Sequence, residues 1–416
     1  MSPSTLADYR AAGYLTAAET ARQVGIKPAT LYAYVSRGIL QAHRPSDGRV
    51  SLYHPADVER LRARPARGAR PELSIPSAIT LVRPDGLYYR GVDAIPLAST
   101  HSYEQVAELL WHGSSGDGRP WHAPDAAAEA GAAAQRALSH DPLPLERLQA
   151  AVAAIASTDP LRFDVTPAAA ERLAPGLIAS MAAALDLRSQ IPDVRVHGLP
   201  AARSLAGNLA ARLSGKRPSA ALVGAVNAAL VLLADHELAA STVAVRMAAA
   251  VRSPVYGCIA AGLGVLQGPL HGGTSLRVED LLAQIRSPAM ADTVIRTHLS
   301  RGDPLWGFGH PLYEDGDPRA AALLNLVLAA APARPRGAVE ALLTFASANS
   351  MPPPTVDLAL GALAHCWSLI RGSGQAIFAI SRTAGWIAHA IEEYGRKANY
   401  RIRAAYTGRP PRTAPD

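Results

Sequence analysis

Ala- and Leu-rich segments with helical spacing constrain the fold of this 416-residue chain more than any other feature. Four of them, separated by short breaks containing Pro and Gly, cover residues 102–113, 145–157, 169–186 and 221–237. Hydrophobic residues make up 49% of the chain but aromatic residues only 5%, which favours close-packed helices over a β-sandwich. No period of about 20–50 residues repeats, so a solenoid is not expected. The sequence predicts a mainly helical protein with a large core.

The cysteines and the apolar segments indicate the cellular compartment of the protein. Cys258 and Cys366 are the only cysteines, too few for a disulfide framework, and neither has the spacing of a metal site. The most apolar run, residues 221–234, is too short to span a bilayer and contains Asn227. The N-terminus lacks the basic and apolar regions of a signal peptide. We expect a cytoplasmic protein with no metal site.

The positive charge is concentrated at the N-terminus. Residues 1–70 contain eleven Lys and Arg against five Asp and Glu, a balance of +6. The rest of the chain is nearly neutral, because the whole chain carries +7. Residues 62–76 are rich in Pro, Arg and Gly, which is typical of a linker. The sequence therefore predicts a small basic domain over residues 1–66, a linker over 67–76 and a larger body that follows.

The basic segment has the signals of two short helices. Thr16 and Glu19 form a capping box before a first helix, which Gly25 interrupts. Pro28 suits the first turn of a second helix, which ends at Gly38. Two short helices with a Gly-containing turn between them are typical of a helix-turn-helix.

A predicted wing follows these helices. Residues 39–44 and 49–53 can pair as strands around the turn at Asp47 and Gly48, and residues 55–64 predict another short helix. Over roughly residues 12–63, this order resembles the winged helix-turn-helix of MerR-type regulators.

The MerR resemblance assigns a small core and a surface for DNA. The expected core residues are Leu15, Val24, Ile26, Leu31 and Val35. Alternatively, the helix-turn-helix is a packing unit whose arginines are merely solvated. If the unit binds DNA, groove and phosphate contacts are expected from the second helix and the wing, at Lys27, Thr30, Tyr32, Arg37, Arg44 and Arg49.

In the body, polar residues stand inside Gly-rich or apolar segments. Glycine next to a histidine permits close approach of the backbone to a ligand. Each residue alone also has an ordinary explanation, such as a hydrogen-bonded histidine, a turn, a helix N-cap or a surface arginine. No phosphate-binding loop, dinucleotide fingerprint or HExxH helix is present. The polar positions occur in the order Asp235–Glu237, Gly268–Gly273, Gly307–His310, Asp317–Arg319, Asp357 and Ser381–His389.

From about residue 77 to 410, these motifs resemble those of the citrate synthase family. The matching segments are GPLHGG, GFGHPLYEDGDPRA, the VD of PTVDLALG, SRTAGWIAHAIEE and a final R-x-R-x-x-Y-x-G. The resemblance implies an all-α body with two helical domains. The large domain would comprise residues 77–271 and 377–416, and the small domain residues 272–376. Closure of one on the other would exclude water.

The resemblance also implies a reaction, the condensation of acetyl-CoA with oxaloacetate, and a homodimer with no permanently bound cofactor. Asp357 would be the base, His271 would donate a hydrogen bond to the enolate oxygen, and His310 would polarise the oxaloacetate carbonyl. The expected oxaloacetate contacts are His236, Arg319, Arg382 and Arg401, of which Arg401 would reach into the neighbouring subunit's site.

Some positions depart from the common family pattern. Pro311 and Glu314 stand where basic residues are frequent, which leaves contacts to coenzyme A open. Thr355 and Leu358, on either side of Asp357, stand where Asn and an aromatic residue are usual. Two alternatives therefore remain. One is a 2-methylcitrate synthase that uses propionyl-CoA, and the other is a DNA-binding regulator whose synthase body senses metabolites.

Overall fold

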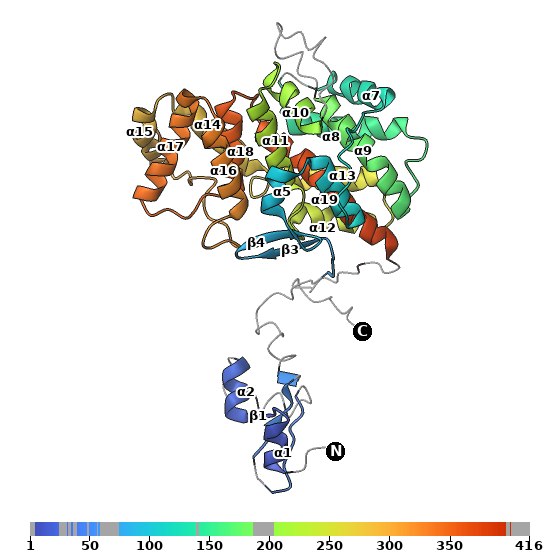
Figure 1. Ribbon diagram of the computed structural model, residues 1–416, viewed down its shortest axis with the longest axis vertical. Helices are drawn as coiled ribbons and strands as arrows, with labels where there is room; N and C mark the ends of the chain where they lie inside the picture. Colours follow the sequence, from blue (N-terminus) through green and yellow to red (C-terminus); the bar gives the residue numbers. More distant parts are fainter. Residues whose placement is uncertain are drawn as a thin grey trace, which may run out of the picture. The chain divides into compact units, whose positions relative to one another are not determined.

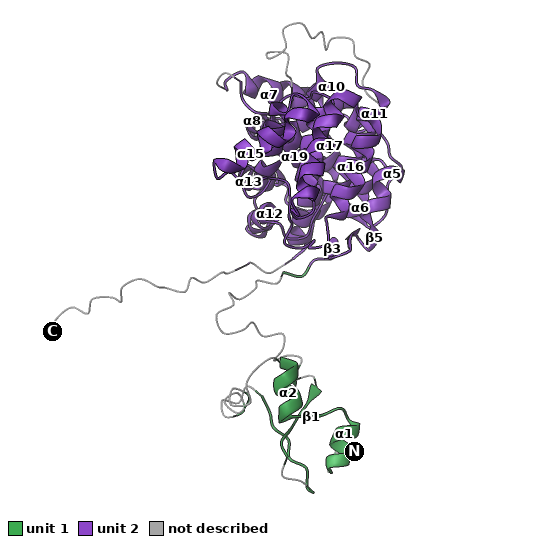
Figure 2. Ribbon diagram, turned by 90° about the vertical axis from the view of Figure 1, so that its left-hand side faces the viewer, with its two compact units in different colours: residues 1–76 green, residues 77–416 purple. Residues whose placement is uncertain are grey.

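The computed structural model divides into two compact units, Met1–Pro76 and Ser77–Asp416, which Figure 2 distinguishes by colour. Each unit has its own hydrophobic core. The residues that the structure describes are 5–24, 31, 35, 40–47, 50–55, 57–58, 75–138, 141–185, 204–396 and 400.

In the first unit, the predicted capping box stands at the start of helix α2 (Ala17–Val24). Helix α1 (Leu6–Ala11) and strand β1 (Leu15–Thr16) precede it. The backbone N–H of Thr16 donates to Oε2 of Glu19 at 2.8 Å, and the N–H of Glu19 donates back to Oγ1 of Thr16 at 3.3 Å. These bonds satisfy two of the N–H groups that a helix N-terminus leaves without partners.

The two segments of the predicted wing hairpin pair through one antiparallel bridge. His43 and Leu52 exchange both backbone hydrogen bonds at 2.8 Å. Strand β2 (Leu52–Tyr53), however, forms its ladder with β1, which the sequence did not predict. Leu31 is buried in the core of this unit, and Leu15, Val24 and Val35 pack against it, as predicted. Ile26, Gly25, Pro28 and Gly38 lie outside the described residues.

The second unit begins with a small antiparallel sheet. Strands β3 (Thr80–Arg83) and β4 (Gly86–Tyr89) form a hairpin, and β5 (Val92–Asp93) pairs with β4. The hydroxyl of Tyr89 donates to the carbonyl of Val231 at 2.9 Å. This bond joins the sheet to the end of a helix that leads into the candidate site.

All four predicted Ala- and Leu-rich segments are helices, and most begin at a Ser or Thr cap such as Ser102 or Ser219. One group of helices comprises α5 (Ala94–Thr100), α6 (Tyr103–His112), α7 (Asp125–Gln135), α8 (Pro144–Thr158), α9 (Pro167–Ala184), α10 (Leu205–Ser214), α11 (Ala220–Leu233), α12 (Ala240–Ala250), α13 (Val255–Leu266) and the long α19 (Ser373–Gly395).

The helices between α13 and α19 gather on one side of the unit, at the left of Figure 1. They fall within residues 272–376, the segment expected to form the small domain, although the exact boundaries of that domain stay a prediction. They are α14 (Gly273–Gln284), the 3₁₀ turn η1 (Pro288–Met290), α15 (Ala291–Ser300), α16 (Pro318–Ala330), α17 (Ala333–Ala348) and α18 (Val356–Cys366).

Helix α19 is buried along most of its length and crosses the core. Gly385 brings it into direct contact with the loop after α11, because its N–H donates to the carbonyl of Ala234 at 3.0 Å. A Cβ at this position would lie 2.3 Å from Oδ1 of Asp235, so a larger residue would push the loop away. The contact fixes the loop that carries His236 relative to Arg382, on the same helix as Gly385.

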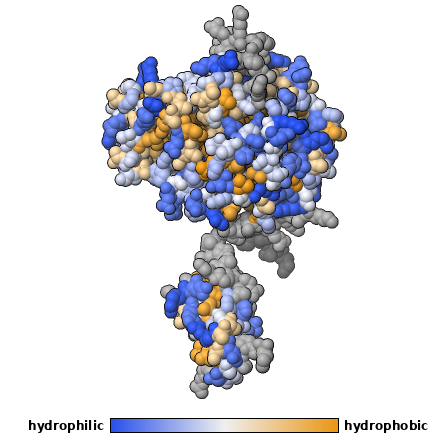
Figure 3. Space-filling view, viewed as in Figure 1, coloured by the Kyte–Doolittle hydropathy of each residue, from blue (hydrophilic) through white to orange (hydrophobic). Residues whose placement is uncertain are grey.

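Among the described residues, no helix has the length and apolar character that a bilayer crossing requires. On the face viewed in Figure 3, hydrophobic residues form patches among polar ones, with one gathering over the side that carries α14–α18.

Candidate active site

Six of the predicted site residues come from six separate sequence motifs and act on one another electrostatically. His236 follows α11, His271 precedes α14, and His310 lies in the loop before α16. The remaining three are on helices: Arg319 on α16, Asp357 in the first turn of α18 and Arg382 on α19. The structure therefore brings together residues that are up to 146 positions apart in the sequence.

Three rings form one part of the site. Nε2 of His236 lies 2.9 Å from the hydroxyl of Tyr313, and the ring centres of His236 and His310 are 5.7 Å apart. Nδ1 of His310 accepts the backbone N–H of Leu312 at 3.1 Å, so the hydrogen of the neutral ring is on Nε2. Burial and the positive charge of Arg319 hold the pKa of both histidines below its usual range. Both rings are therefore neutral near pH 7.

Arg319 is held beside these rings by Asp317. Nε and Nη2 of Arg319 bind the two carboxylate oxygens of Asp317 at 2.9 Å each, and both side chains are buried. The guanidinium carbon lies 5.4 Å from the centre of the Tyr313 ring. Burial disfavours the charged form, but Asp317 raises the pKa of Arg319 above its ordinary value. Arg319 is thus a fixed cation in the site.

Arg382 is a second cation, and it is only 1% exposed. Its Nε donates to the carbonyl of Leu233 at 2.8 Å, and its guanidinium lies 4.8 Å from the Phe378 ring centre. Within the described part of the chain, Nη1 is buried without a hydrogen-bond partner. A buried donor without a partner is costly, so this atom suits an anionic ligand.

His271 stands at the start of α14, where Nε2 lies 2.8 Å from Oγ of Ser241 on α12. The ring also meets Phe378 edge to face, with centroids 5.6 Å apart. Burial, with the charge of Arg382, lowers the pKa of His271 to about 4. The imidazole is therefore neutral at physiological pH.

Asp357 is the acidic member of the site. It lies in the first turn of α18 and is not the N-cap, a position that Thr355 occupies. Its Oδ1 is buried and has no hydrogen-bond partner among the residues that the structure describes. Burial raises the pKa of Asp357 to about 7, although Arg319 opposes the shift. A carboxyl group with such a pKa is suited to accept and release a proton near neutrality.

Several predicted residues lie outside the described part of the chain, namely Arg401 and the candidate DNA contacts Lys27, Thr30, Tyr32, Arg37 and Arg49. Arg44 is described and is exposed on the wing. Within the described ranges, no cluster of three His, Cys, Asp or Glu side chains has the geometry to hold a metal ion.

Three residues of the site had no role predicted from the sequence. Asp317 stood only within the Asp317–Arg319 motif, for which a turn was the ordinary explanation, and Tyr313 only within the segment GFGHPLYEDGDPRA. Ser241 has no local signal at all, because only the packing of α12 against the loop before α14 brings it to His271. A polar residue that acts through a tertiary contact cannot be recognised from its neighbours in the sequence.

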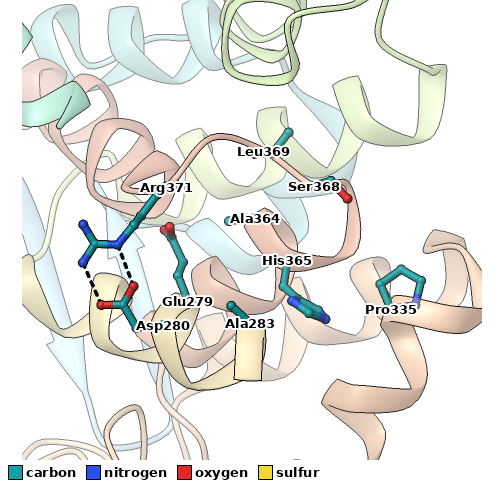
Figure 4. Close-up of a pocket in the computed structure, with 9 residues that line it drawn as sticks. All are labelled: Glu279, Asp280, Ala283, Pro335, Ala364, His365, Ser368, Leu369 and Arg371. Atoms are coloured by element: carbon teal, nitrogen blue, oxygen red, sulfur yellow. Dashed lines mark hydrogen bonds and ion pairs between the residues drawn. The ribbon is translucent and has the colours of Figure 1, made fainter. Parts of the chain in front are cut away.

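A separate cavity of about 310 Å³ lies where α14, α17, α18 and the loop before α19 meet (Figure 4). Glu279 accepts the backbone N–H groups of Gly372 and Gly374 at 2.7 and 2.8 Å. Beside it, Arg371 binds both carboxylate oxygens of Asp280, as the dashed lines show. Burial raises the pKa of Glu279 to about 7. These bonds join the α14–α18 group to α19, the helix that carries Arg382.

Comparisons with known proteins agree with this geometry. The family described as "Citrate synthase, C-terminal domain" matches residues 68–405, and "MerR HTH family regulatory protein" matches residues 15–63. Citrate synthase 2 of Bacillus subtilis is 30% identical over 364 residues, which cover 82% of this chain and 95% of that protein. A 2-methylcitrate synthase of Mycobacterium tuberculosis is 28% identical over 359 residues, covering 82% and 89%.

A solved structure shares the fold. It is the ternary complex of citrate synthase from Thermoplasma acidophilum with carboxymethyl coenzyme A and oxaloacetate. The TM-score is 0.69 at 25% identity, over 82% of this chain and 96% of that one. The predicted helical fold is confirmed, and so is the MerR resemblance at the N-terminus. The chain belongs to the citrate synthase family and is an acyltransferase of the citrate synthase type.

Proposed function

We propose that the body condenses acetyl-CoA with oxaloacetate and hydrolyses the resulting citryl-CoA to citrate and CoA. The observation that carries this proposal is the environment of Asp357. A carboxyl group whose pKa is near 7 shares a site with neutral imidazoles and two buried arginines. This arrangement suits removal of a proton from a weakly acidic carbon next to a thioester.

The first step is the transfer of an α-proton from acetyl-CoA to the carboxylate of Asp357. The electron pair of the C–H bond moves toward the thioester oxygen and forms an enolate. His271 stabilises this oxygen by hydrogen bonding. If Ser241 donates its hydroxyl hydrogen to Nε2, the neutral ring carries its own proton on Nδ1, where it can donate to the enolate.

The second step joins two carbon atoms. The enolate carbon attacks the keto carbon of oxaloacetate, while the N–H of His310 gives its proton to the keto oxygen, which becomes the citryl hydroxyl. Water then attacks the thioester carbonyl of citryl-CoA and loses a proton to His310. The C–S bond breaks, and the leaving sulfur takes the proton held by Asp357, so that CoA leaves as the thiol. Arg319 and Arg382 hold the substrate carboxylates, because a guanidinium matches a carboxylate in shape and charge.

A thiol-release assay tests the reaction and its acyl specificity. Purified protein is given oxaloacetate with either acetyl-CoA or propionyl-CoA, and CoA formation is followed for each. Higher kcat/KM with acetyl-CoA supports the proposal, whereas a preference for propionyl-CoA supports the 2-methylcitrate alternative. One methylene is worth only about 1–3 kcal/mol, so both rates are needed. No thiol release with either substrate would contradict the proposed synthase.

We further propose a homodimer in which Arg401 completes the partner's oxaloacetate site. The proposal comes from the family motif at residues 401–408. Mixing Arg401→Ala protein with Asp357→Asn protein tests it, because heterodimers would contain one site with both residues intact. Activity above that of either parent, after confirmed subunit exchange, is expected. A mixture no more active than its components would contradict the shared site.

For the first unit we propose DNA binding through its helix-turn-helix. The MerR match over residues 15–63 and the +6 charge balance of residues 1–70 support it. A regulator that uses the synthase body only as a sensor is the rival function. Such a protein would bind oxaloacetate or acyl-CoA without releasing thiol, so the assay above separates the two functions.

A further inference from the structure

A line of buried polar and charged side chains leads from the site along α19. Asp235 directly precedes His236, and its Oδ2 lies 3.3 Å from Nε2 of His389. On the other side of the imidazole, Nδ1 lies 2.6 Å from Nη1 of Arg246. The side chains of Asp235, His389 and Arg246 have no exposed surface. Bulk solvent therefore does not reach these side chains, and they form hydrogen bonds with one another.

The order of these groups fixes the direction of the hydrogen bonds. A guanidinium group offers only donors, so Nδ1 of His389 must accept from Arg246. The hydrogen of the neutral ring is then on Nε2, which donates to Asp235. At the other end, Nη1 of Arg246 donates to Oε2 of Glu392 at 2.8 Å, and Nη2 forms an ion pair with Glu393. These two carboxylates hold Arg246 in place.

Asp235 also acts electrostatically on Arg382, the second cation of the site, whose Nε binds the carbonyl of Leu233, two residues before Asp235. Burial lowers the pKa of Arg382, and the carboxylate of Asp235 is the foremost charge that opposes this shift. Yet the two side chains form no hydrogen bond with each other. Within the part of the chain that the structure describes, Oδ1 of Asp235 and Nη1 of Arg382 are both buried without a partner at hydrogen-bond distance. Burial raises the pKa of Asp235, but His389, Arg382 and the hydroxyl of Thr80 favour its charged form and lower it overall. An acceptor and a donor of opposite charge thus remain apart inside the core.

We propose that His389 is a positioning residue that holds Asp235 away from Arg382 and so leaves the guanidinium free for a dicarboxylate substrate. This inference rests on the function proposed above. If Asp235 paired directly with Arg382, a substrate carboxylate would have to displace it, and separating a buried ion pair is costly. Bound to His389, the carboxylate stabilises the charge of Arg382 without occupying its donors.

Replacing His389 with leucine tests the proposal. His389→Leu keeps apolar bulk but removes both hydrogen bonds of the ring, so Asp235 is expected to turn to Arg382. The calorimetric Kd for oxaloacetate and its KM should rise about tenfold or more, whereas kcat at saturation should stay within about threefold. Adding Asp235→Asn should return the Kd to within about threefold of wild type, because an amide forms no ion pair with a guanidinium.

Two variants serve as controls. His389→Gln retains a donor and an acceptor and should keep a Kd close to that of wild type. His365→Leu removes a half-buried imidazole of α18 that has no hydrogen-bond partner in the described residues, and it should leave the Kd unchanged. Thermal unfolding reports whether each variant folds. If His389→Leu does not fold, His389→Asn replaces it, because asparagine is too short to reach both neighbours.

The outcomes separate this inference from the proposed function. Wild-type protein that binds no oxaloacetate would contradict the proposed function, and the positioning role with it. If wild type binds and a folded His389→Leu variant binds equally well, the positioning role is overturned. The same holds if the double variant with Asp235→Asn binds as weakly as His389→Leu alone.

Discussion

Asp317 and Arg319, two residues apart at the start of α16, form a buried bidentate ion pair with both contacts at 2.9 Å. The same carboxylate accepts the backbone N–H of Arg319 at 3.0 Å and that of Val356 at 3.1 Å. Asp317 therefore ties the start of α16 to the first turn of α18, where Asp357 lies. The Asp317 carboxylate therefore orients Arg319, which is predicted to bind the substrate. It also orients the backbone next to Asp357, the predicted base.

We expect Asp317→Asn to weaken both stability and substrate binding. Removing one partner of a buried ion pair leaves the other charge uncompensated, at a cost of about 3–5 kcal/mol. The free energy of unfolding should fall by an amount of this order, and KM for oxaloacetate should rise. Denaturant titration and steady-state kinetics measure the two effects. Asp315→Asn, which changes a nearby exposed carboxylate, is the control, and equal stability of the two variants would refute the anchoring role.

Asp357→Asn should fold and bind oxaloacetate but lose most of its turnover. An amide cannot accept the α-proton, and loss of a general base lowers kcat by about 10²–10⁴-fold. Thiol release measures kcat, and calorimetry with oxaloacetate shows that the site is intact. Turnover within a few-fold of wild type would exclude Asp357 as the base. Asp303→Asn, an exposed acid of the loop before the Gly307–His310 motif, is a suitable control.

Activity should rise with pH until the base is ionised. Since burial raises the pKa of Asp357 to about 7, the proton-accepting form is in the minority below that pH. We expect kcat/KM to increase about tenfold per pH unit well below pH 7 and to level off above it. His271 adds no change in this range, because its pKa is lowered to about 4. A value of kcat/KM that stays constant between pH 5 and 8 would contradict the role of Asp357 as the base. An unperturbed histidine would also titrate in this range.

The fold was largely predictable because its signals are local. The helix over Pro144–Thr158 has apolar residues at helical spacing, and the start of α2 is set by Thr16 and Glu19, which are three residues apart. The strand pairing of β1 with β2 was not predictable, since it joins Leu15 to Tyr53 across the helix-turn-helix. Such a pairing depends on tertiary packing and leaves no periodic pattern in either strand.

The site was predictable only where its residues belong to motifs. His271, His310 and Asp357 stand in segments that resemble a known family, and the charge of Arg319 or Arg382 acts on each of them in the structure. Their protonation depends instead on burial, which the sequence does not reveal. The link between His389 and Asp235 could not be predicted either, because 154 residues separate the two partners of that hydrogen bond.

The buried Glu279 should make stability depend on pH in a defined direction. Its pKa is about 7 in the folded protein against an ordinary value of 4.5, so the folded state binds the proton more tightly. Stability from this group is therefore present below pH 4.5 and is lost as the pH rises to about 7. Relative to Glu279→Gln, the wild type should lose up to roughly 3 kcal/mol of unfolding free energy over that interval.

Urea unfolding of both proteins at several pH values measures this difference. Glu340→Gln, which changes an exposed carboxylate on α17, is the matched control for the general effect of removing one acid. A difference between wild type and Glu279→Gln that stays constant from pH 4.5 to 7 would show that the charge of Glu279 is not suppressed by burial.

The last prediction separates the two units of the chain. Residues 1–70 hold +6 of the net charge, and each of the six described site residues lies beyond residue 230. A protein that begins near Glu72 should therefore remain an active synthase, whereas the full-length chain alone should bind DNA. Contacts between arginine and phosphate release counterions, so the affinity should fall steeply as salt increases.

Thiol release by the shortened protein and gel mobility shifts of both proteins across a salt series give the decisive comparison. The full-length protein is the control for activity, and the shortened protein is the control for DNA binding. If the full-length chain binds no DNA even at low salt, its first unit is a packing or oligomerisation element, despite the MerR match over residues 15–63. If shortening abolishes turnover in a protein that still folds, the first unit is needed by the synthase. The boundary between the two compact units at Pro76 would then not be a functional boundary.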